Sequence, residues 1–206
     1  MCGRYYLELK AKNIQMLAIF EEAARRQRLL TGQETLSGGE VFPGMTVAAL
    51  AMGKSGQGAY PMRWGFARSN GGGLLINVRS ESAMKKFEAS MLNRRCLIPM
   101  SWYFEWQAQE DARNKIKYAI WPRKAEPAYL AGIYRYEEGQ KLPALSILTR
   151  EAAPGIAFIH PRMPVIFSES LREPWLMGKE DPGALLDRCE TDMACRMEEG
   201  AACRGL

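Results

Sequence analysis

Hydrophobic positions along the chain follow two different spacings. Apolar residues three or four positions apart, with charged residues between them, are typical of helices that bury one face. Short apolar or alternating runs bounded by turn residues instead predict strands. The first spacing predicts helices over residues 11–30, with Ile14, Leu17, Phe20 and Ala24 on the apolar face, and over residues 82–92. The second predicts strands at 3–7, 46–52, 57–66, 74–79, 95–107, 116–121, 128–134, 142–149 and 165–167.

Turn and loop signals separate these elements. Residues 53–56 predict a hairpin turn, and loops are expected at 31–40 and in the glycine-rich stretch 67–73. Two short helices are expected within 168–187, whereas residues 188–206 are weakly patterned. No internal repeat, low-complexity segment or linker divides the chain. This order of elements predicts an α+β fold over residues 1–206, a single domain with a curved, barrel-like, mostly antiparallel β-sheet and flanking helices.

Composition is that of a globular protein, with 47% hydrophobic and 25% charged residues among 206. No apolar run approaches the length of a membrane span. Glu8 and Lys10 interrupt the apolar start that a signal peptide needs, so we expect a cytoplasmic protein with no membrane partner. The net charge of +5 permits a polyanionic partner but does not require one.

Cysteine and histidine usage argues against a metal site. The five cysteines are odd in number, form no Cys-x-x-Cys pair, and accompany a single histidine. Neither a disulfide framework nor a zinc site fits this pattern. We therefore expect no metal and no cofactor.

The first residues, Met1-Cys2-Gly3-Arg4, hold the first candidate chemistry. Initiator methionine is normally removed before a small residue, which would leave Cys2 with an α-amine and a thiol on adjacent carbons. The amine titrates at about pH 7.7–8.0, and a cationic neighbour lowers a thiol pKa. A 1,2-aminothiol condenses with an aldehyde and closes to a thiazolidine ring. On this dipeptide alone, an ordinary second residue is the simpler interpretation.

A carboxylate stands inside the most aromatic stretch of the chain. In a strand, Trp102 and Trp106 share one face, and Tyr103 and Glu105 share the other. Burial of Glu105 among aromatic residues would raise its pKa toward the range useful for proton transfer. The commoner fate of a glutamate is an edge strand that faces water.

Polar residues elsewhere supply further candidates. His160 must carry any imidazole chemistry by itself, although a lone histidine beside proline is more often structural. Asn77 ends an apolar strand and either orients a reactant or simply terminates the strand. Three arginines lie within four residues of these candidates and suit phosphate recognition, or else form surface ion pairs worth under about 1 kcal/mol. They are Arg4, Arg79 and Arg162.

Five stretches form an ordered set within residues 1–176. They are 1–4, Pro61-Met62-Arg63-Trp64-Gly65-Phe66, Ile76-Asn77-Val78-Arg79-Ser80-Glu81-Ser82, Arg95-Cys96-Leu97-Ile98-Pro99 through Tyr103-Phe104-Glu105-Trp106, and Ile159-His160-Pro161-Arg162-Met163-Pro164. Together they resemble the SOS-response-associated peptidase (SRAP) family, the abasic-site processing proteins. The resemblance implies the SRAP fold, a groove for single-stranded DNA, and covalent capture of the ring-opened aldehyde of an abasic site.

The resemblance also implies roles, carried over by position. Cys2 is the nucleophile that ends as the thiazolidine, and Asn77 positions the N-terminus or the sugar. Glu105 transfers protons, and His160 assists sugar opening and reversal of the crosslink. The phosphates beside the lesion would be held by Arg4, Arg79 and Arg162. We accordingly expect a monomer whose partner is single-stranded DNA containing abasic sites, with self-removal of Met1.

The sequence departs from the family in four places. Pro161 stands where an acidic residue is expected, and the asparagine expected shortly before Pro43 is missing. The loop 67–73 has no tryptophan, which puts an aromatic wedge against bases in doubt. The segment after residue 187 lacks the pattern of the family's closing strand.

Two other functions compete with DNA capture. In a thiol peptidase or amidase, Cys2 would attack a carbonyl with His160 as base. A non-catalytic reader would bind single-stranded DNA through arginines and exposed aromatic residues. A trapped acyl-enzyme would support the peptidase or amidase. Reversible binding without an adduct would support the non-catalytic reader.

Overall fold

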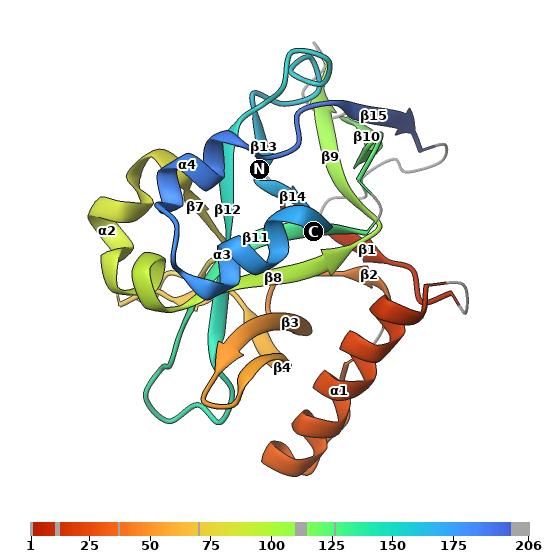
Figure 1. Ribbon diagram of the computed structural model, residues 1–206. Coiled ribbons are helices and arrows are strands. Elements are labelled where there is room, and N and C mark those ends of the chain that lie inside the picture. Colours follow the sequence, from red (N-terminus) through yellow and green to blue (C-terminus); the bar gives the residue numbers. More distant parts are fainter. Residues whose placement is uncertain are drawn as a thin grey trace.

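Two β-sheets organise the chain in the computed structural model of the protein, which describes residues 2–10, 13–36, 38–69, 71–109, 115–125 and 127–198. The first sheet is antiparallel throughout, in the order β15-β10-β9-β1-β2 (Figure 1). Its strands are β1 (Tyr5–Leu7), β2 (Gly39–Val41), β9 (Trp102–Ala108), β10 (Lys115–Pro122) and β15 (Met193–Met197).

The second sheet closes on itself. Strand β11 pairs with β12 as well as with β8, so β12, β4, β3, β8 and β11 form a ring. The strands of this sheet are β3 (Thr46–Gly53), β4 (Gly56–Trp64), β7 (Asn77–Arg79), β8 (Arg95–Met100), β11 (Ala128–Arg135), β12 (Ala144–Glu151), β13 (Arg162–Pro164) and β14 (Ile166–Ser168). Its parallel pairs are β12 with β4 and β12 with β7. A separate small hairpin joins β5 (Phe66–Ala67) to β6 (Leu74–Leu75).

Helices cover the outer side of this second sheet (Figure 1). They are α1 (Ile14–Thr31), α2 (Ser80–Asn93), α3 (Arg172–Met177) and α4 (Pro182–Asp187), with a 3-10 turn at Glu169–Leu171. The side chain of Asn13 caps α1 by accepting from the Met16 N–H at 3.2 Å, and Gly32 ends the helix at φ 74°. None of the described helices has the length and apolar character that a membrane crossing requires.

Two apolar cores result from this layering. One lies between the first sheet and the inner face of the second, and buries Cys2, Tyr5 and Trp64. The other lies between the outer face of the second sheet and the helices, and buries Phe66 and Trp175. Each fully buried large apolar side chain contributes roughly 1.5–3 kcal/mol to stability.

The expected fold class is confirmed: α+β, with a curved, barrel-like, mostly antiparallel sheet and flanking helices. The expected apolar face of α1 is partly wrong, because Ile14 is 76% exposed and the buried face is centred on Met16, Ile19 and Ala23. Part of the predicted loop 31–40 is strand β2, which pairs with β1.

The expectation that no closing strand follows residue 187 is also wrong. Strand β15 pairs with β10 over five residues, with Cys195 opposite Ile120. Its local pattern is short and mixed, so the pairing is set by the neighbouring strand and not by the segment's own periodicity. Residues beyond 198, the end of the weakly patterned tail, lie outside the described residues.

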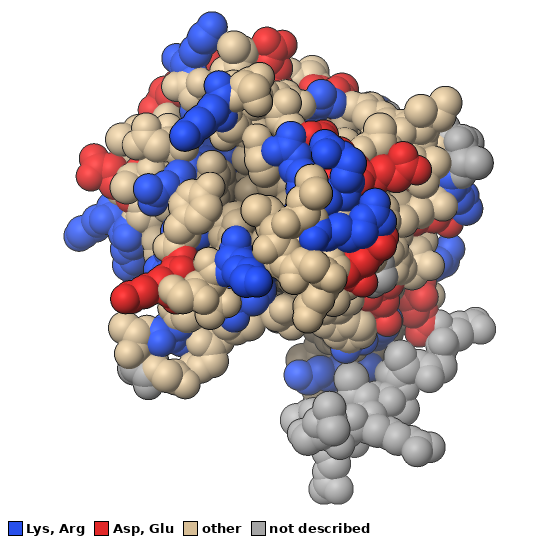
Figure 2. Space-filling model, turned by 90° about the horizontal axis from the view of Figure 1, so that it is seen from below, with Lys and Arg blue, Asp and Glu red and all other residues tan. Residues whose placement is uncertain are grey.

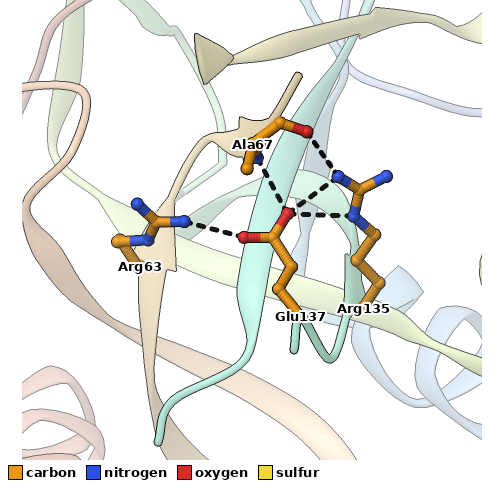
Figure 3. Close-up of polar contacts among 4 residues, drawn as sticks. All are labelled: Arg63, Ala67, Arg135 and Glu137. Carbon is orange, nitrogen blue, oxygen red and sulfur yellow. Dashed lines mark hydrogen bonds and ion pairs between the residues drawn. The ribbon is translucent and has the colours of Figure 1, made fainter. Parts of the chain in front are cut away.

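A buried carboxylate anchors the base of the glycine-rich loop 67–73 (Figure 3). Glu137 accepts from the Ala67 N–H at 2.8 Å, from Arg135 Nε at 3.0 Å and Nη2 at 2.8 Å, and from Arg63 Nη2 at 2.7 Å. Burial acts to raise the pKa of Glu137, but the hydrogen bonds and charges of these donors hold it below its usual value. The loop therefore starts from a fixed point.

Replacing Glu137 with alanine should lower the free energy of unfolding by about 1–3 kcal/mol, because the donors of Ala67, Arg63 and Arg135 lose their charged acceptor. Urea denaturation measures this change. Glu138→Ala, at the exposed neighbouring position, is the matched control and should leave stability nearly unchanged. Equal effects of the two substitutions would contradict an anchoring role.

Candidate active site

Cys2 precedes β1 in the chain and is completely buried. Its Sγ lies 3.9 Å from the Arg4 carbonyl oxygen, which also accepts from the Phe104 N–H at 2.9 Å. These contacts tie the start of the chain to β9. Burial, and next the charge of Glu105, raise the pKa of the Cys2 thiol to about 12. The thiol is therefore protonated at neutral pH, and its attack on any electrophile requires a neighbouring base. Met1 lies outside the described residues.

Asn77 holds the main chain of Cys2. Its Nδ2 donates to the Cys2 carbonyl oxygen at 2.8 Å. The residue before it is fixed in turn, because Trp64 Nε1 donates to the Ile76 carbonyl oxygen at 3.0 Å. Asn77 is 8% exposed, and its Oδ1 has no hydrogen-bond partner within the described part of the chain. A donor from a water or from a bound molecule would satisfy this buried acceptor.

Glu105 lies on the buried face of β9, as the strand alternation predicts. It is 5% exposed, and its Oε1 accepts from the Trp106 N–H at 3.2 Å. The neighbouring Tyr103 has its pKa raised by burial and by the nearby charges of Cys2 and Glu105. A carboxylate and a thiol are thus both buried, and the charge of Glu105 acts on the thiol of Cys2.

His160 is oriented by the main chain of Arg162. Its Nδ1 lies 3.0 Å from the Arg162 backbone nitrogen and 3.2 Å from the Arg162 carbonyl oxygen. The departure at Pro161 therefore leaves the imidazole held by the residue that follows the proline. The adjacent Pro161 carbonyl oxygen accepts from the Ala152 N–H at 2.9 Å and holds the segment to the chain after β12.

Arg162 is engaged by a carboxylate that the sequence analysis missed. Its Nη1 and Nη2 donate to the two oxygens of Glu81 at 2.5 and 2.9 Å, and Nη2 also donates to the Thr149 carbonyl oxygen at 2.7 Å. The hydrogen bond from Arg162 is the main cause that lowers the pKa of Glu81. The Glu81 side chain is 55% exposed, so it contacts the guanidinium group of Arg162 from the solvent side. A phosphate at Arg162 would replace it.

The other two candidate arginines differ in setting. Arg79 is exposed at the start of α2, opposite Thr149 in the register of β7 and β12, which places it near Arg162. Arg4 turns toward the opposite face of the first sheet, where it pairs with Glu40 at 3.3 Å and stacks over Trp106 at 5.0 Å. The structure therefore groups Arg79 with Arg162 and leaves Arg4 on a different face from the Cys2 thiol.

The supporting residues missed by the sequence analysis had weak local signals. Glu81 and Trp64 belong to the five ordered stretches, but nothing in their local sequence indicates a contact with the candidate site residues. Lys117, which donates to Glu40 at 2.9 Å, stands in an ordinary alternating strand. Only contacts between distant segments reveal what these side chains do.

An apolar cavity elsewhere is not a competing active site. It measures about 390 Å³ and lies between the C-terminal half of α1, the β3–β4 hairpin and the β11–β12 connection. Its described lining residues include no thiol, carboxylate or imidazole. This side is seen in Figure 2, where lysine and arginine side chains stand around a hollow. The described residues also contain no cluster of three or more His, Cys, Asp or Glu suited to a metal ion.

Alkylation of Cys2 in the folded protein should keep rising with pH well above pH 9. Only the thiolate reacts, and burial raises its pKa to about 12. In urea the same thiol should reach a plateau above its ordinary pKa of about 8.5. Iodoacetamide labelling followed by mass spectrometry of the N-terminal peptide gives both profiles. Matching profiles in the folded and unfolded chains would contradict the raised pKa.

Comparison with known proteins identifies the family of the chain. The chain matches the family described as SOS response associated peptidase (SRAP) over residues 1–198. The Abasic site processing protein YoqW of Bacillus subtilis (strain 168) is 29% identical over 196 residues, covering 90% of this chain and 84% of that protein. The Abasic site processing protein YedK of Escherichia coli (strain K12) is 26% identical over 189 residues, covering 87% and 83%.

The fold is shared with solved structures. An X-ray crystal structure of a protein from Bacteroides thetaiotaomicron matches with a TM-score of 0.75 at 18% identity, covering 95% of this chain and 91% of that chain. At this identity the likeness establishes the fold alone.

Proposed function

Because this chain belongs to the SOS response associated peptidase (SRAP) family, we propose that it processes abasic sites in single-stranded DNA by capturing them covalently at Cys2. The relatives named above are abasic site processing proteins. One observation carries the proposal: the Asn77 amide holds the Cys2 carbonyl at 2.8 Å, beside the buried carboxylate of Glu105. This hydrogen bond restrains the main chain that carries both reactive groups of an N-terminal cysteine.

The reaction is a condensation that needs no other reagent. After Met1 is removed, the Cys2 amine adds to the aldehyde of the ring-opened abasic sugar and loses one water to form an imine. The sulfur then forms a bond to the imine carbon, while the thiol proton passes to the nitrogen. The product is a five-membered thiazolidine that joins protein and DNA.

Glu105 is the group that moves this proton. Because burial and the charge of Glu105 raise the thiol pKa, sulfur attacks the imine carbon as its proton leaves. The Glu105 carboxylate is close enough for its charge to act on the thiol, and it can return the proton to the imine nitrogen. His160, held at Nδ1 by the main chain of Arg162, assists opening of the sugar and reversal of the crosslink by proton transfer.

The test is incubation of the chain with a single-stranded oligonucleotide treated with uracil glycosylase. Denaturing electrophoresis without reductant should show an adduct. Its intact mass should equal the protein lacking Met1 plus the oligonucleotide, minus one water. A matched oligonucleotide with an intact base is the control. A reversible complex with no adduct would favour the non-catalytic reader.

The peptidase hypothesis requires a different pKa of the same thiol. A thiolate nucleophile paired with an imidazolium has a lowered pKa. Burial raises the pKa of Cys2 here, which does not favour that chemistry. Hydrolysis of peptides other than the Met1–Cys2 bond, blocked by a thiol-directed amide analogue, would support a peptidase instead.

Binding of undamaged single-stranded DNA should weaken steeply with salt, as counterion release requires. Arg162→Ala should weaken binding for every sequence and lower the salt slope by about one. Glu81→Gln should act in the opposite direction, because it frees the guanidinium fork from its carboxylate. Fluorescence anisotropy at several salt concentrations measures both, with Arg25→Ala, an exposed arginine of α1, as control. Unchanged affinity in both variants would exclude a phosphate at Arg162.

A further inference from the structure

A pocket of about 610 Å³ lies on the outer face of the first sheet, opposite the face that buries Cys2 and Tyr103. Its lining includes Trp102 of β9, together with Ala119 and Trp121 of β10. These residues alternate with residues that point into the core. The volume is within the range of sites for small molecules. The pocket is therefore separate from the site around Cys2 and is lined by different residues.

Two indoles border this pocket. Tyr103 pairs with Ile120, and this register places Trp102 across from Trp121 on the neighbouring strand. On the side of β1, Trp102 stacks on Tyr6 with a centroid distance of 4.4 Å and an interplanar angle of 4°, which fixes its plane. Ala119, two residues before Trp121, leaves room between the larger side chains. Both indoles are only partly buried, so they can stack on a planar ring.

Lysine and arginine side chains surround the two indoles of this pocket. Four of them line the pocket and are mostly exposed: Lys10, Arg123, Lys124 and Arg196. Three carboxylates pair with these cations: Glu8, Asp192 and Glu198. Asp192 is shared, at 3.4 Å from Arg123 and 3.8 Å from Lys124. Exposed pairs of this kind contribute little, so an incoming phosphate can replace the shared carboxylate.

We propose that this pocket binds a nucleotide, with its base stacked on Trp102 and Trp121 and its phosphate held by Arg123, Lys124 and Arg196. The inference goes beyond the proposed function, because the pocket lies on another face and the lining residues that the structure describes include no thiol. The same chemistry has two sources: a free mononucleotide, or one nucleotide of a DNA strand that continues past the reactive site. Stacking on an aromatic side chain accepts any base, so little sequence preference is expected.

The experiment measures binding of both sources to the whole chain at low salt. Deoxyadenosine monophosphate is titrated by calorimetry, and undamaged oligothymidylates of about 4 to 16 nucleotides by fluorescence anisotropy. Trp121→Ala should weaken binding of the responding probe about five- to a hundredfold, the effect of losing one stacking aromatic. The double variant Lys124→Glu with Arg196→Glu changes exposed charges only and should weaken it as well. Tyr136→Ala and Arg25→Glu, at exposed positions outside this pocket, are the controls.

The two sources give different results. Loss of mononucleotide binding identifies a small-molecule site, whereas loss confined to longer oligothymidylates identifies a strand path. Wild-type affinity for both probes in Trp121→Ala and in the double variant would overturn the proposal. Capture of a short abasic oligonucleotide by Cys2 should be unchanged in these variants, so failure of this site and failure of the proposed function are distinguishable.

Discussion

Replacing Cys2 with alanine is expected to abolish the heat-stable adduct with abasic single-stranded DNA in the absence of a reductant. The physical reason lies in what each atom can form. An amine alone gives an imine, which hydrolyses in water, and a thiol alone gives a reversible hemithioacetal. Only an amine and a thiol on adjacent carbons close a five-membered ring. The loss should be complete on a denaturing gel, the largest effect expected for any substitution.

Two further variants separate the amine from the sulfur. Cys2→Ala keeps an N-terminal amine, so adding borohydride should restore an adduct by reducing the imine. An extra residue that remains ahead of Cys2 keeps the thiol but moves the amine, and should prevent a stable adduct. Cys2→Ser should form no ring or a much less stable one. A heat-stable crosslink from Cys2→Ala without reductant would show that another residue is the nucleophile.

Glu105→Gln is expected to slow adduct formation about a hundred- to ten-thousand-fold, the usual effect of losing a positioned proton-transfer group. The side chain keeps its size, but it can no longer take the proton of a thiol whose pKa is raised to about 12. Single-turnover kinetics with an abasic oligonucleotide measure the rate. His160→Ala should act on a separate step, slowing sugar opening and reversal of the crosslink.

Thermal unfolding distinguishes chemical roles from structural ones. Both variants should melt near the wild type, since Glu105→Gln preserves the volume of a buried side chain and His160 is partly exposed just before β13. Rates should fall while the melting temperature holds. A large loss of stability with unchanged adduct kinetics would show that these residues only support the fold.

The sequence by itself determined the local elements and the candidate reactive groups. A strand period of two places Tyr103 and Glu105 on one face in any fold, and the structure has both buried. The single histidine and the N-terminal cysteine required no structure to be recognised. The fold class followed from the order of strands and helices, because each helix or strand has its own hydrophobic period.

The tertiary structure alone decided how those groups are set. It brings Asn77 within 2.8 Å of Cys2, across 75 positions of sequence, and raises a thiol pKa that the sequence left open in direction. It also places Glu81 on Arg162, pairs β15 with β10, and turns Met16 instead of Ile14 toward the core. Each outcome depends on burial or charge supplied by a distant segment. Local periodicity specifies which face of an element is apolar only approximately, and it contains no information about which other segment will cover that face.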